Sequence, residues 1–304
     1  MAEISGLRGV LPALVTPLLP DGEIDPAGTR RLIAHVLDGG VGGVLALGST
    51  GEVASLPLAA RRRYLETVVE AVAGRVPVLA GVARDNLADA ALEVEAATAA
   101  GAAGALVAPP HYYLTDQATV LAFYRHLAAG SPLPLLVYNI PQLTKVRVEP
   151  GTLRQLAEEG AIAGVKDSSR DFEYFQMVAA AVRDLPGFRL FTGSDTMLLA
   201  SLAMGGAGTI CGGANVAPGW VVGIDDAFRQ GRWEEARKRQ HELVALVEML
   251  RVGVFPAAIK SALAAQGVCG PWPAPPVAPL SGEAAIALRE RLEFWGLVPA
   301  ATVA

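Results

Sequence analysis

The sequence predicts one (β/α)8 barrel, the TIM-barrel fold, followed by a C-terminal helical extension. Three observations support this fold class: eight short apolar runs, helical patterns between most of them, and turns rich in glycine and proline. Near-continuous apolarity is typical of parallel strands that are buried on both faces. The eight runs are 9–17, 43–50, 77–82, 104–110, 134–141, 162–169, 189–194 and 208–215.

The segments between these runs have the ends of helices. Asp25 offers an N-cap and Pro26 a favourable first residue for a helix that stops at Gly39. Eight strand–helix units in series close most naturally into a barrel. An open doubly wound sheet is the weaker alternative, because no GxGxxG motif follows the first run. Similar helical patterns occupy 56–72, 85–100, 116–129, 150–159 and 171–184.

The strand-like runs end before residue 218, and helical patterns continue beyond it. They cover 218–229, 233–251, 254–266 and 281–295, with a proline-rich linker at 270–279. We therefore expect a barrel domain at 1–229 and a C-terminal helical region at 230–304.

Composition narrows the class of protein. The 304 residues are 52% hydrophobic, which is enough for a large buried core. The net charge of −5 comes from scattered charges, so no basic stripe predicts binding to nucleic acid or to a membrane surface. No apolar run reaches the roughly 20 residues of a spanning helix, and the first residues lack a signal-like stretch. We expect a cytoplasmic protein with no membrane partner.

Few residues could hold a metal. The four histidines lack any spacing typical of a metal site, and Cys211 and Cys269 are most simply two reduced thiols. The sequence therefore predicts no metal and disfavours a metal-dependent mechanism.

Lys166 is the most informative residue. It is one of four lysines and the one that ends an apolar run, IAGVK, at the edge where barrels carry their active sites. Burial disfavours the charged form of an amine, and a neutral amine attacks a ketone to give an imine. The structural alternative is a lysine that pairs with Asp167 or another carboxylate at a strand end.

Hydroxyl groups end two other predicted strands. Tyr138 is expected at the height of Lys166 on the neighbouring strand, where its phenol could relay a proton. The alternative is a core tyrosine bound to a backbone carbonyl. Ser49 and Thr50, in a glycine-containing turn before a helix, suit a substrate carboxylate.

Four motifs in register resemble the dihydrodipicolinate synthase / N-acetylneuraminate lyase family. The similarity runs from about residue 9 to residue 297, and the motifs are GSTGE at 48–52, YNIP at 138–141, GVKDSS at 164–169 and GSD at 193–195. The resemblance implies a homotetrameric barrel enzyme, a metal-independent class I lyase or aldolase. It also implies no cofactor beyond a covalent imine with a 2-oxo acid such as pyruvate.

The resemblance also implies roles for individual residues. Lys166 would form the Schiff base, Tyr138 would shuttle protons, and Ser49 and Thr50 would bind the pyruvate carboxylate. Tyr112, or its neighbour Tyr113, would insert into the site of a neighbouring subunit. The remaining matches are Gly193 and Ile210, which would line the pyruvate pocket, and Asp195, which would contact the substrate.

Departures from the family pattern bear on the substrate. Leu143 stands where dihydrodipicolinate synthases usually carry an arginine, and Lys145 nearby cannot reproduce a bidentate fork. Thr196 and Gly212 replace an acid and a serine that N-acetylneuraminate lyases use. The stretches 208–216 and 231–240 are similar to those of 4-hydroxy-2-oxoglutarate and 2-keto-3-deoxy sugar acid aldolases.

These features favour retro-aldol cleavage of a short 4-hydroxy-2-oxo acid to pyruvate and an aldehyde. The first rival is 4-hydroxy-tetrahydrodipicolinate synthase, which condenses pyruvate with aspartate semialdehyde. A dehydratase acting on deoxy sugar acids is a further possibility, since it would share the imine. A rival of another class is a non-catalytic barrel that binds a 2-oxo acid.

Overall fold

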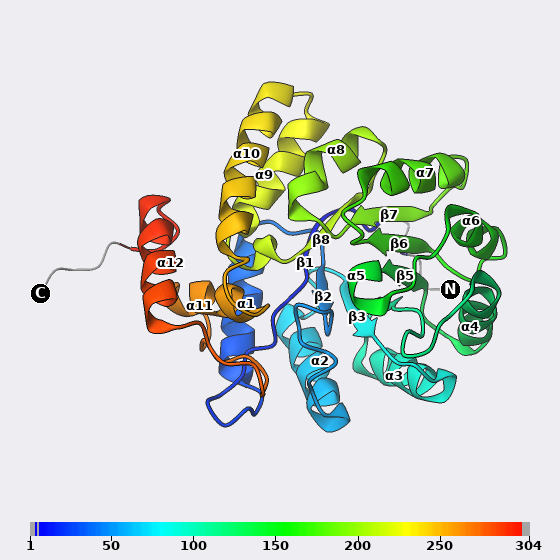
Figure 1. Cartoon of the computed structure of the whole chain (residues 1–304), viewed down its shortest axis with the longest axis horizontal. Coiled ribbons are helices and arrows are strands. Elements are labelled where there is room, and N and C mark those ends of the chain that lie inside the picture. Colours follow the sequence, from blue (N-terminus) through cyan, green and yellow to red (C-terminus); the bar gives the residue numbers. More distant parts are fainter. Residues whose placement is uncertain (1–3, 5, 300–304) are drawn as a thin grey trace, which may run out of the picture.

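Eight parallel strands form the centre of the molecule and helices surround them (Figure 1). The computed structural model describes residue 4 and residues 6–299. The strands are β1 (Gly9–Pro12), β2 (Val44–Ala46), β3 (Val78–Val82), β4 (Gly104–Val107), β5 (Leu135–Asn139), β6 (Gly164–Asp167), β7 (Arg189–Thr192) and β8 (Gly208–Cys211). Each lies within one of the eight predicted runs.

The sheet closes on itself between β1 and β2. The ladder order is β1-β8-β7-β6-β5-β4-β3-β2, and a parallel bridge joins Ala13 to Leu45 across the remaining gap. The Leu14 N–H donates to the Leu45 carbonyl over 2.9 Å at the same place. The predicted barrel is therefore confirmed, and the open-sheet alternative is wrong.

Large apolar side chains fill the interior of the barrel. They form one buried cluster that includes Leu11, Leu45, Leu79, Leu106, Leu136, Tyr138, Phe191 and Ile210. Because the interior is packed rather than hollow, space for a ligand is left at the rim of the strands.

Helices follow most strands, close to the predicted boundaries. Those around the barrel are α1 (Pro26–Asp38), α2 (Leu58–Val72), α3 (Leu87–Ala100), α4 (Gln117–Gly130), α6 (Pro150–Glu158), α7 (Phe172–Val182), α8 (Leu198–Ala203) and α9 (Pro218–Arg229). The Asp25 carboxylate accepts from the Gly28 N–H at the start of α1, as the predicted N-cap requires. Two helices were not predicted, α8 and α5 (Pro141–Thr144), because each spans less than two turns and shows no helical period.

Three further helices pack along one side of the barrel (left in Figure 1). They are α10 (Trp233–Met249), α11 (Ala257–Ala265) and α12 (Gly282–Phe294). Leu243 and Ile259 belong to the same hydrophobic cluster as Val44 of β2, so α10 and α11 join a buried layer that is separate from the barrel interior. The predicted boundary at 229/230 falls between α9 and α10. Residues 1–3, 5 and 300–304 of the predicted regions lie outside the described residues.

Within the part of the chain that the structure describes, no helix combines the length and the apolarity needed to cross a membrane.

Candidate active site

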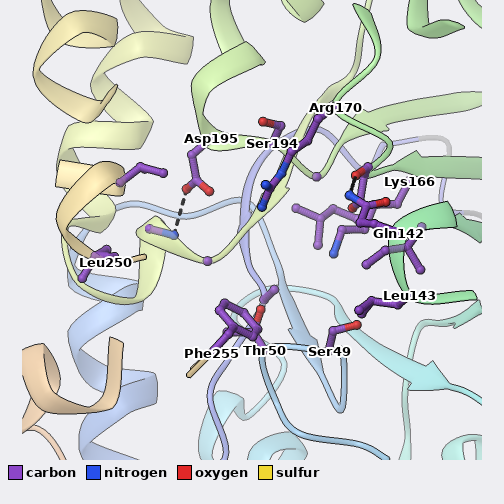
Figure 2. Close-up of a pocket in the computed structure, with 18 of the residues that line it drawn as sticks. Ser49, Thr50, Gln142, Leu143, Lys166, Arg170, Ser194, Asp195, Leu250 and Phe255 are labelled. Carbon is purple, nitrogen blue, oxygen red and sulfur yellow. Dashed lines mark hydrogen bonds between the residues drawn. The ribbon is translucent and has the colours of Figure 1, made fainter. Parts of the chain in front are cut away.

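A cavity of about 490 Å³ opens at the carboxyl ends of the strands (Figure 2). This is the edge where barrel enzymes carry their active sites. The predicted residues that line it are Ser49, Thr50, Tyr138, Lys166, Gly193, Asp195 and Ile210, and they are joined by Gln142, Leu143, Ser168, Arg170, Ser194, Leu250, Arg251, Phe255 and Ile259.

Lys166 and Tyr138 occupy matching positions on adjacent strands. The two residues are register partners in the β5–β6 ladder, as the sequence predicted. Lys166 is only 3% exposed, and its Nζ lies 4.4 Å from the centroid of the Tyr138 ring. A buried primary amine thus faces the cavity beside an aromatic ring with a phenol.

Asp167 does not pair with Lys166. Successive side chains of a strand point to opposite faces, so Asp167 faces away from the barrel interior. There its carboxylate accepts hydrogen bonds from the Asn139 side chain at 2.8 Å and from the Ser169 hydroxyl at 2.9 Å. Burial raises the pKa of the Asp167 carboxyl, and these donors oppose the rise. The alternative of a structural Lys166–Asp167 pair is wrong.

The phenol of Tyr138 has a different partner from the other buried tyrosines. Its oxygen lies 3.3 Å from the Ser49 hydroxyl oxygen. By contrast, Tyr64, Tyr124 and Tyr174 each donate to a backbone carbonyl, which is the behaviour of a structural tyrosine. Tyr138 and Ser49 therefore form a hydroxyl pair at the cavity.

The turn that carries Ser49 and Thr50 has an unusual backbone. Leu47 and Glu52, at its two ends, adopt φ values of 60° and 57°, in the left-handed region that non-glycine residues seldom occupy. A β-carbon at Gly81 of β3 would lie 2.1 Å from the Leu47 carbonyl oxygen. The strand therefore needs glycine there for the turn to approach so closely.

A buried ion pair ties this turn to the C-terminal helices. Glu52 forms a salt bridge with Lys260 of α11, whose side chain is completely buried. Lys260 also donates to the Trp272 carbonyl at 2.9 Å, and Glu52 accepts from the Ala274 N–H at 2.6 Å. Burial lowers the pKa of Lys260, and the Glu52 carboxylate opposes this. The C-terminal region thus holds the end of the turn that presents Thr50.

Gly193 makes room for the lysine. A β-carbon at this position would lie 1.9 Å from the Ser168 hydroxyl oxygen and 2.9 Å from Cε of Lys166. Ile210 of β8 is completely buried and forms part of the cavity wall. The two residues predicted to line a pyruvate pocket therefore both reach the cavity.

Asp195 lies at the start of a short 3-10 turn after β7 (Figure 2). Its carboxylate accepts from the Gly213 N–H at 2.8 Å and so joins the loops that follow β7 and β8. Burial raises the pKa of the Asp195 carboxyl, against the opposing hydrogen bonds from the Cys211 thiol and the Gly213 N–H. Asp195 therefore lines the cavity and also holds together the loops that follow β7 and β8.

Tyr112 does not reach this cavity. It and Tyr113 are 77% and 79% exposed, and their rings meet edge to face with centroids 5.2 Å apart. Asp85 accepts hydrogen bonds from the backbone N–H of Tyr112 and holds this loop. A role for Tyr112 in catalysis would need a second copy of the chain, as the family resemblance implies.

Several cavity residues escaped the sequence analysis. Arg170 lies one residue beyond the predicted strand run 162–169, and its φ of 61° carried no signal in the sequence. Leu250, Arg251 and Phe255 come from the turn between α10 and α11. Their place at the cavity depends on how the C-terminal helices fold back, so no local pattern could reveal it.

Comparison with known proteins decides the family. The sequence profile of the dihydrodipicolinate synthetase family matches residues 6–294. The chain belongs to this family. It is therefore an enzyme of a lyase family, and the resemblance drawn from the four motifs is confirmed.

Two relatives show the range of names in the family. A DapA-like lyase of Halobacterium salinarum, described as uncharacterized, is 38% identical over 271 residues, covering 89% of this chain and 88% of the relative. The 4-hydroxy-tetrahydrodipicolinate synthase of Salinibacter ruber is 35% identical and covers 98% of both chains.

Solved structures of the family share the whole fold. A monomeric variant of dihydrodipicolinate synthase superposes with a TM-score of 0.93 at 28% identity, over 97% of this chain and 99% of the other. YagE, a prophage protein of this family from Escherichia coli K12 in complex with pyruvate, gives a TM-score of 0.92 at 28% identity. It covers 95% of this chain and 99% of its own.

Proposed function

We propose that the protein is a metal-independent class I aldolase that binds its 2-oxo acid substrate as an imine on Lys166. The observation that carries the proposal is the position of Lys166, a buried amine at the cavity wall beside Tyr138. Across residue 4 and residues 6–299, no Asp or Glu carboxylate lies within salt-bridge distance of this amine. It is therefore available as a nucleophile.

The chemistry follows from the residues around the amine. The Lys166 nitrogen attacks the C2 carbonyl carbon, and its proton passes to the carbonyl oxygen to give a carbinolamine. The Tyr138 phenol then donates its proton to the departing hydroxyl, so that water leaves and a protonated imine and a phenolate remain. The Tyr138 phenolate oxygen accepts the proton of the 4-hydroxyl group, and the C3–C4 bond breaks to release an aldehyde. The electrons of the C3–C4 bond form a C2–C3 double bond, and the π electrons of the protonated imine move to its nitrogen to give a neutral enamine. Protonation at C3 and hydrolysis then release pyruvate and regenerate the lysine.

Hydroxyl groups assist both proton transfer and substrate binding in this reaction. Ser49, 3.3 Å from the Tyr138 oxygen, is placed to exchange a proton with the phenol. Ser49 and Thr50 line the same cavity and donate hydrogen bonds to the C1 carboxylate in the proposed complex. No step requires a cofactor other than the covalent imine.

The favoured substrate is a short 4-hydroxy-2-oxo acid, cleaved to pyruvate and an aldehyde. A cavity of about 490 Å³ suits a small substrate. Leu143 lines its mouth, and the amine of Lys145 donates to the Gln142 carbonyl at 2.9 Å within its own loop. Neither side chain supplies the bidentate fork that dihydrodipicolinate synthases use at this loop.

The second candidate is 4-hydroxy-tetrahydrodipicolinate synthase. Relatives from Salinibacter ruber and Methanopyrus kandleri carry that name at 35% and 36% identity over almost the whole chain, which favours it. Two assays of the same preparation separate the candidates. Pyruvate release from 4-hydroxy-2-oxo acids supports cleavage, whereas faster pyruvate consumption with aspartate semialdehyde supports the synthase. The homotetramer and the cytoplasmic location stay predictions.

A further inference from the structure

The imine chemistry leaves two arginines at the cavity without a role, Arg170 and Arg251, and we consider the one that lies closest to Lys166 in the chain. Arg170 follows β6 in the same loop as Ser168 and lines the cavity four residues after Lys166. Figure 2 shows its guanidinium reaching into the cavity from the side of Ser194, whereas Ser49 and Thr50 lie on the opposite side.

The backbone at Arg170 is held in a conformation that arginine rarely adopts. Its φ is 61°, in the left-handed region where a β-carbon crowds the backbone and glycine is favoured. Non-glycine residues persist there when their surroundings impose the conformation, and such positions cluster at functional sites. The left-handed backbone of Arg170 and the direction of its side chain into the cavity are thus two separate indications of a functional residue.

Arg170 has no acidic partner of its own. The neighbouring carboxylate, Asp171, caps α7 through the Tyr174 N–H at 3.0 Å and pairs with Arg147 at 3.1 Å. Asp195, which follows Ser194 on the same side of the cavity, accepts a hydrogen bond from the Gly213 N–H at 2.8 Å. Among the residues that the structure describes, none places a carboxylate within 4.0 Å of the Arg170 guanidinium. Its donors are free for a ligand.

The positions of these side chains around Lys166 indicate where each end of a bound substrate would lie. In the proposed complex the C1 carboxylate of the substrate lies at Ser49 and Thr50, and its C2 carbon lies at Lys166. The remaining carbons of the substrate then extend toward Arg170 and Ser194. A guanidinium binds a carboxylate through two parallel hydrogen bonds. We propose that Arg170 binds a second carboxylate at the distal end of the substrate, which makes the preferred ligand a 2-oxo dicarboxylic acid. This inference rests on the proposed function, because it takes the imine at Lys166 as the fixed point.

Borohydride trapping tests the inference without knowledge of the natural substrate. The half-saturating concentration for irreversible labelling is measured with 2-oxoglutarate and with 2-oxopentanoate, which ends in a methyl group. The pair 2-oxoadipate and 2-oxohexanoate repeats the comparison at one more carbon, and pyruvate is the reference. Arg170→Gln is compared with Arg183→Gln, an exposed arginine at the far end of α7 from the cavity.

In the wild type, at least one dicarboxylate, 2-oxoglutarate or 2-oxoadipate, should have a lower half-saturating concentration than the methyl-ended acid of the same carbon number. Arg170→Gln should raise the half-saturating concentration of that dicarboxylate about tenfold, toward the lower end for a charge-assisted hydrogen bond because the side chain is exposed. The values for pyruvate and the methyl-ended acids should stay within about twofold. Arg183→Gln should change none of them.

Each other outcome has a defined meaning. No pyruvate adduct on the wild type refutes the proposed function, and the inference falls with it. Pyruvate trapping without a preference for either dicarboxylate, or an equal loss on all ligands in Arg170→Gln, overturns the inference alone. If Arg170→Gln traps nothing, Arg170→Lys decides, since it keeps the charge and loses the fork. Selective weakening of the dicarboxylate then supports the inference, and unchanged preference overturns it.

Discussion

The hydroxyl oxygens of Tyr138 and Ser49 lie 3.3 Å apart, although the two residues are 89 positions apart in the chain. Tyr138 is held on β5 beside Lys166, and Ser49 is held in the turn after β2. Because these elements converge at one rim of the barrel, a phenol, a hydroxyl and an amine share one cavity. The proposed proton relay depends on this convergence.

Tyr138→Phe should lower kcat by about 10²- to 10⁴-fold, because it removes the acid–base hydroxyl and keeps the ring. Trapping of pyruvate by borohydride should persist, since Lys166 is untouched. Tyr124→Phe is the matched control, because its hydroxyl donates to a backbone carbonyl away from the cavity. That variant should lose about 1 kcal/mol of stability and keep its kcat. An unchanged kcat in Tyr138→Phe would place the proton relay elsewhere.

Gly193→Ala should abolish trapping of pyruvate. The added methyl group would lie 1.9 Å from the Ser168 hydroxyl oxygen and 2.9 Å from Cε of Lys166, so the lysine must move. Adding Ser168→Ala removes the clash with the hydroxyl oxygen. It leaves the contacts with Cε of Lys166 at 2.9 Å and with the β-carbon of residue 168 at 3.0 Å, so the double variant should not recover. Gly151→Ala, where a β-carbon has open space, is the control and should trap normally. Normal labelling of Gly193→Ala would show that the lysine tolerates displacement.

Lys260→Met should destabilise the fold by about 3–5 kcal/mol in urea unfolding, because it leaves the buried Glu52 carboxylate without its charge partner. The double variant Glu52→Gln, Lys260→Met should be less destabilised than the sum of the two single variants, since neither charge remains. Strict additivity would mean that the two residues do not act as a pair.

Asp195→Asn should change the dependence of stability on pH. Burial raises the pKa of the Asp195 carboxyl above its ordinary value of 3.8, so the folded protein binds more protons than the unfolded chain above that value. The stability contribution of this group is therefore present at low pH and is lost as the pH rises through the folded pKa. Asparagine cannot ionise and keeps an oxygen for the Gly213 N–H. In urea unfolding, the variant should gain stability relative to wild type between pH 4 and pH 7. An equal difference at both values would contradict the account.

Local sequence patterns were enough to predict the barrel and the facing pair of Lys166 and Tyr138. Buried parallel strands are apolar along their length, and each strand-end motif lies directly beside the strand that positions it. Long-range packing was not predictable in this way. Glu52 meets Lys260 only because α11 folds back on the barrel, and Phe255 reaches the cavity for the same reason. Arg170 was not predicted, because the direction of its side chain depends on a backbone φ angle that cannot be inferred from the sequence.

Covalent labelling tests the central claim most directly. The intact protein, treated exhaustively with a chelator, is incubated with pyruvate and borohydride, and the adduct is located by mass spectrometry of peptides. We predict one reduced adduct on Lys166, none on Lys145, Lys238 or Lys260, and none at all in Lys166→Ala, with the same yield before and after chelation. No adduct on Lys166, an adduct on another lysine, or a yield that a divalent metal ion must restore would contradict the proposed mechanism.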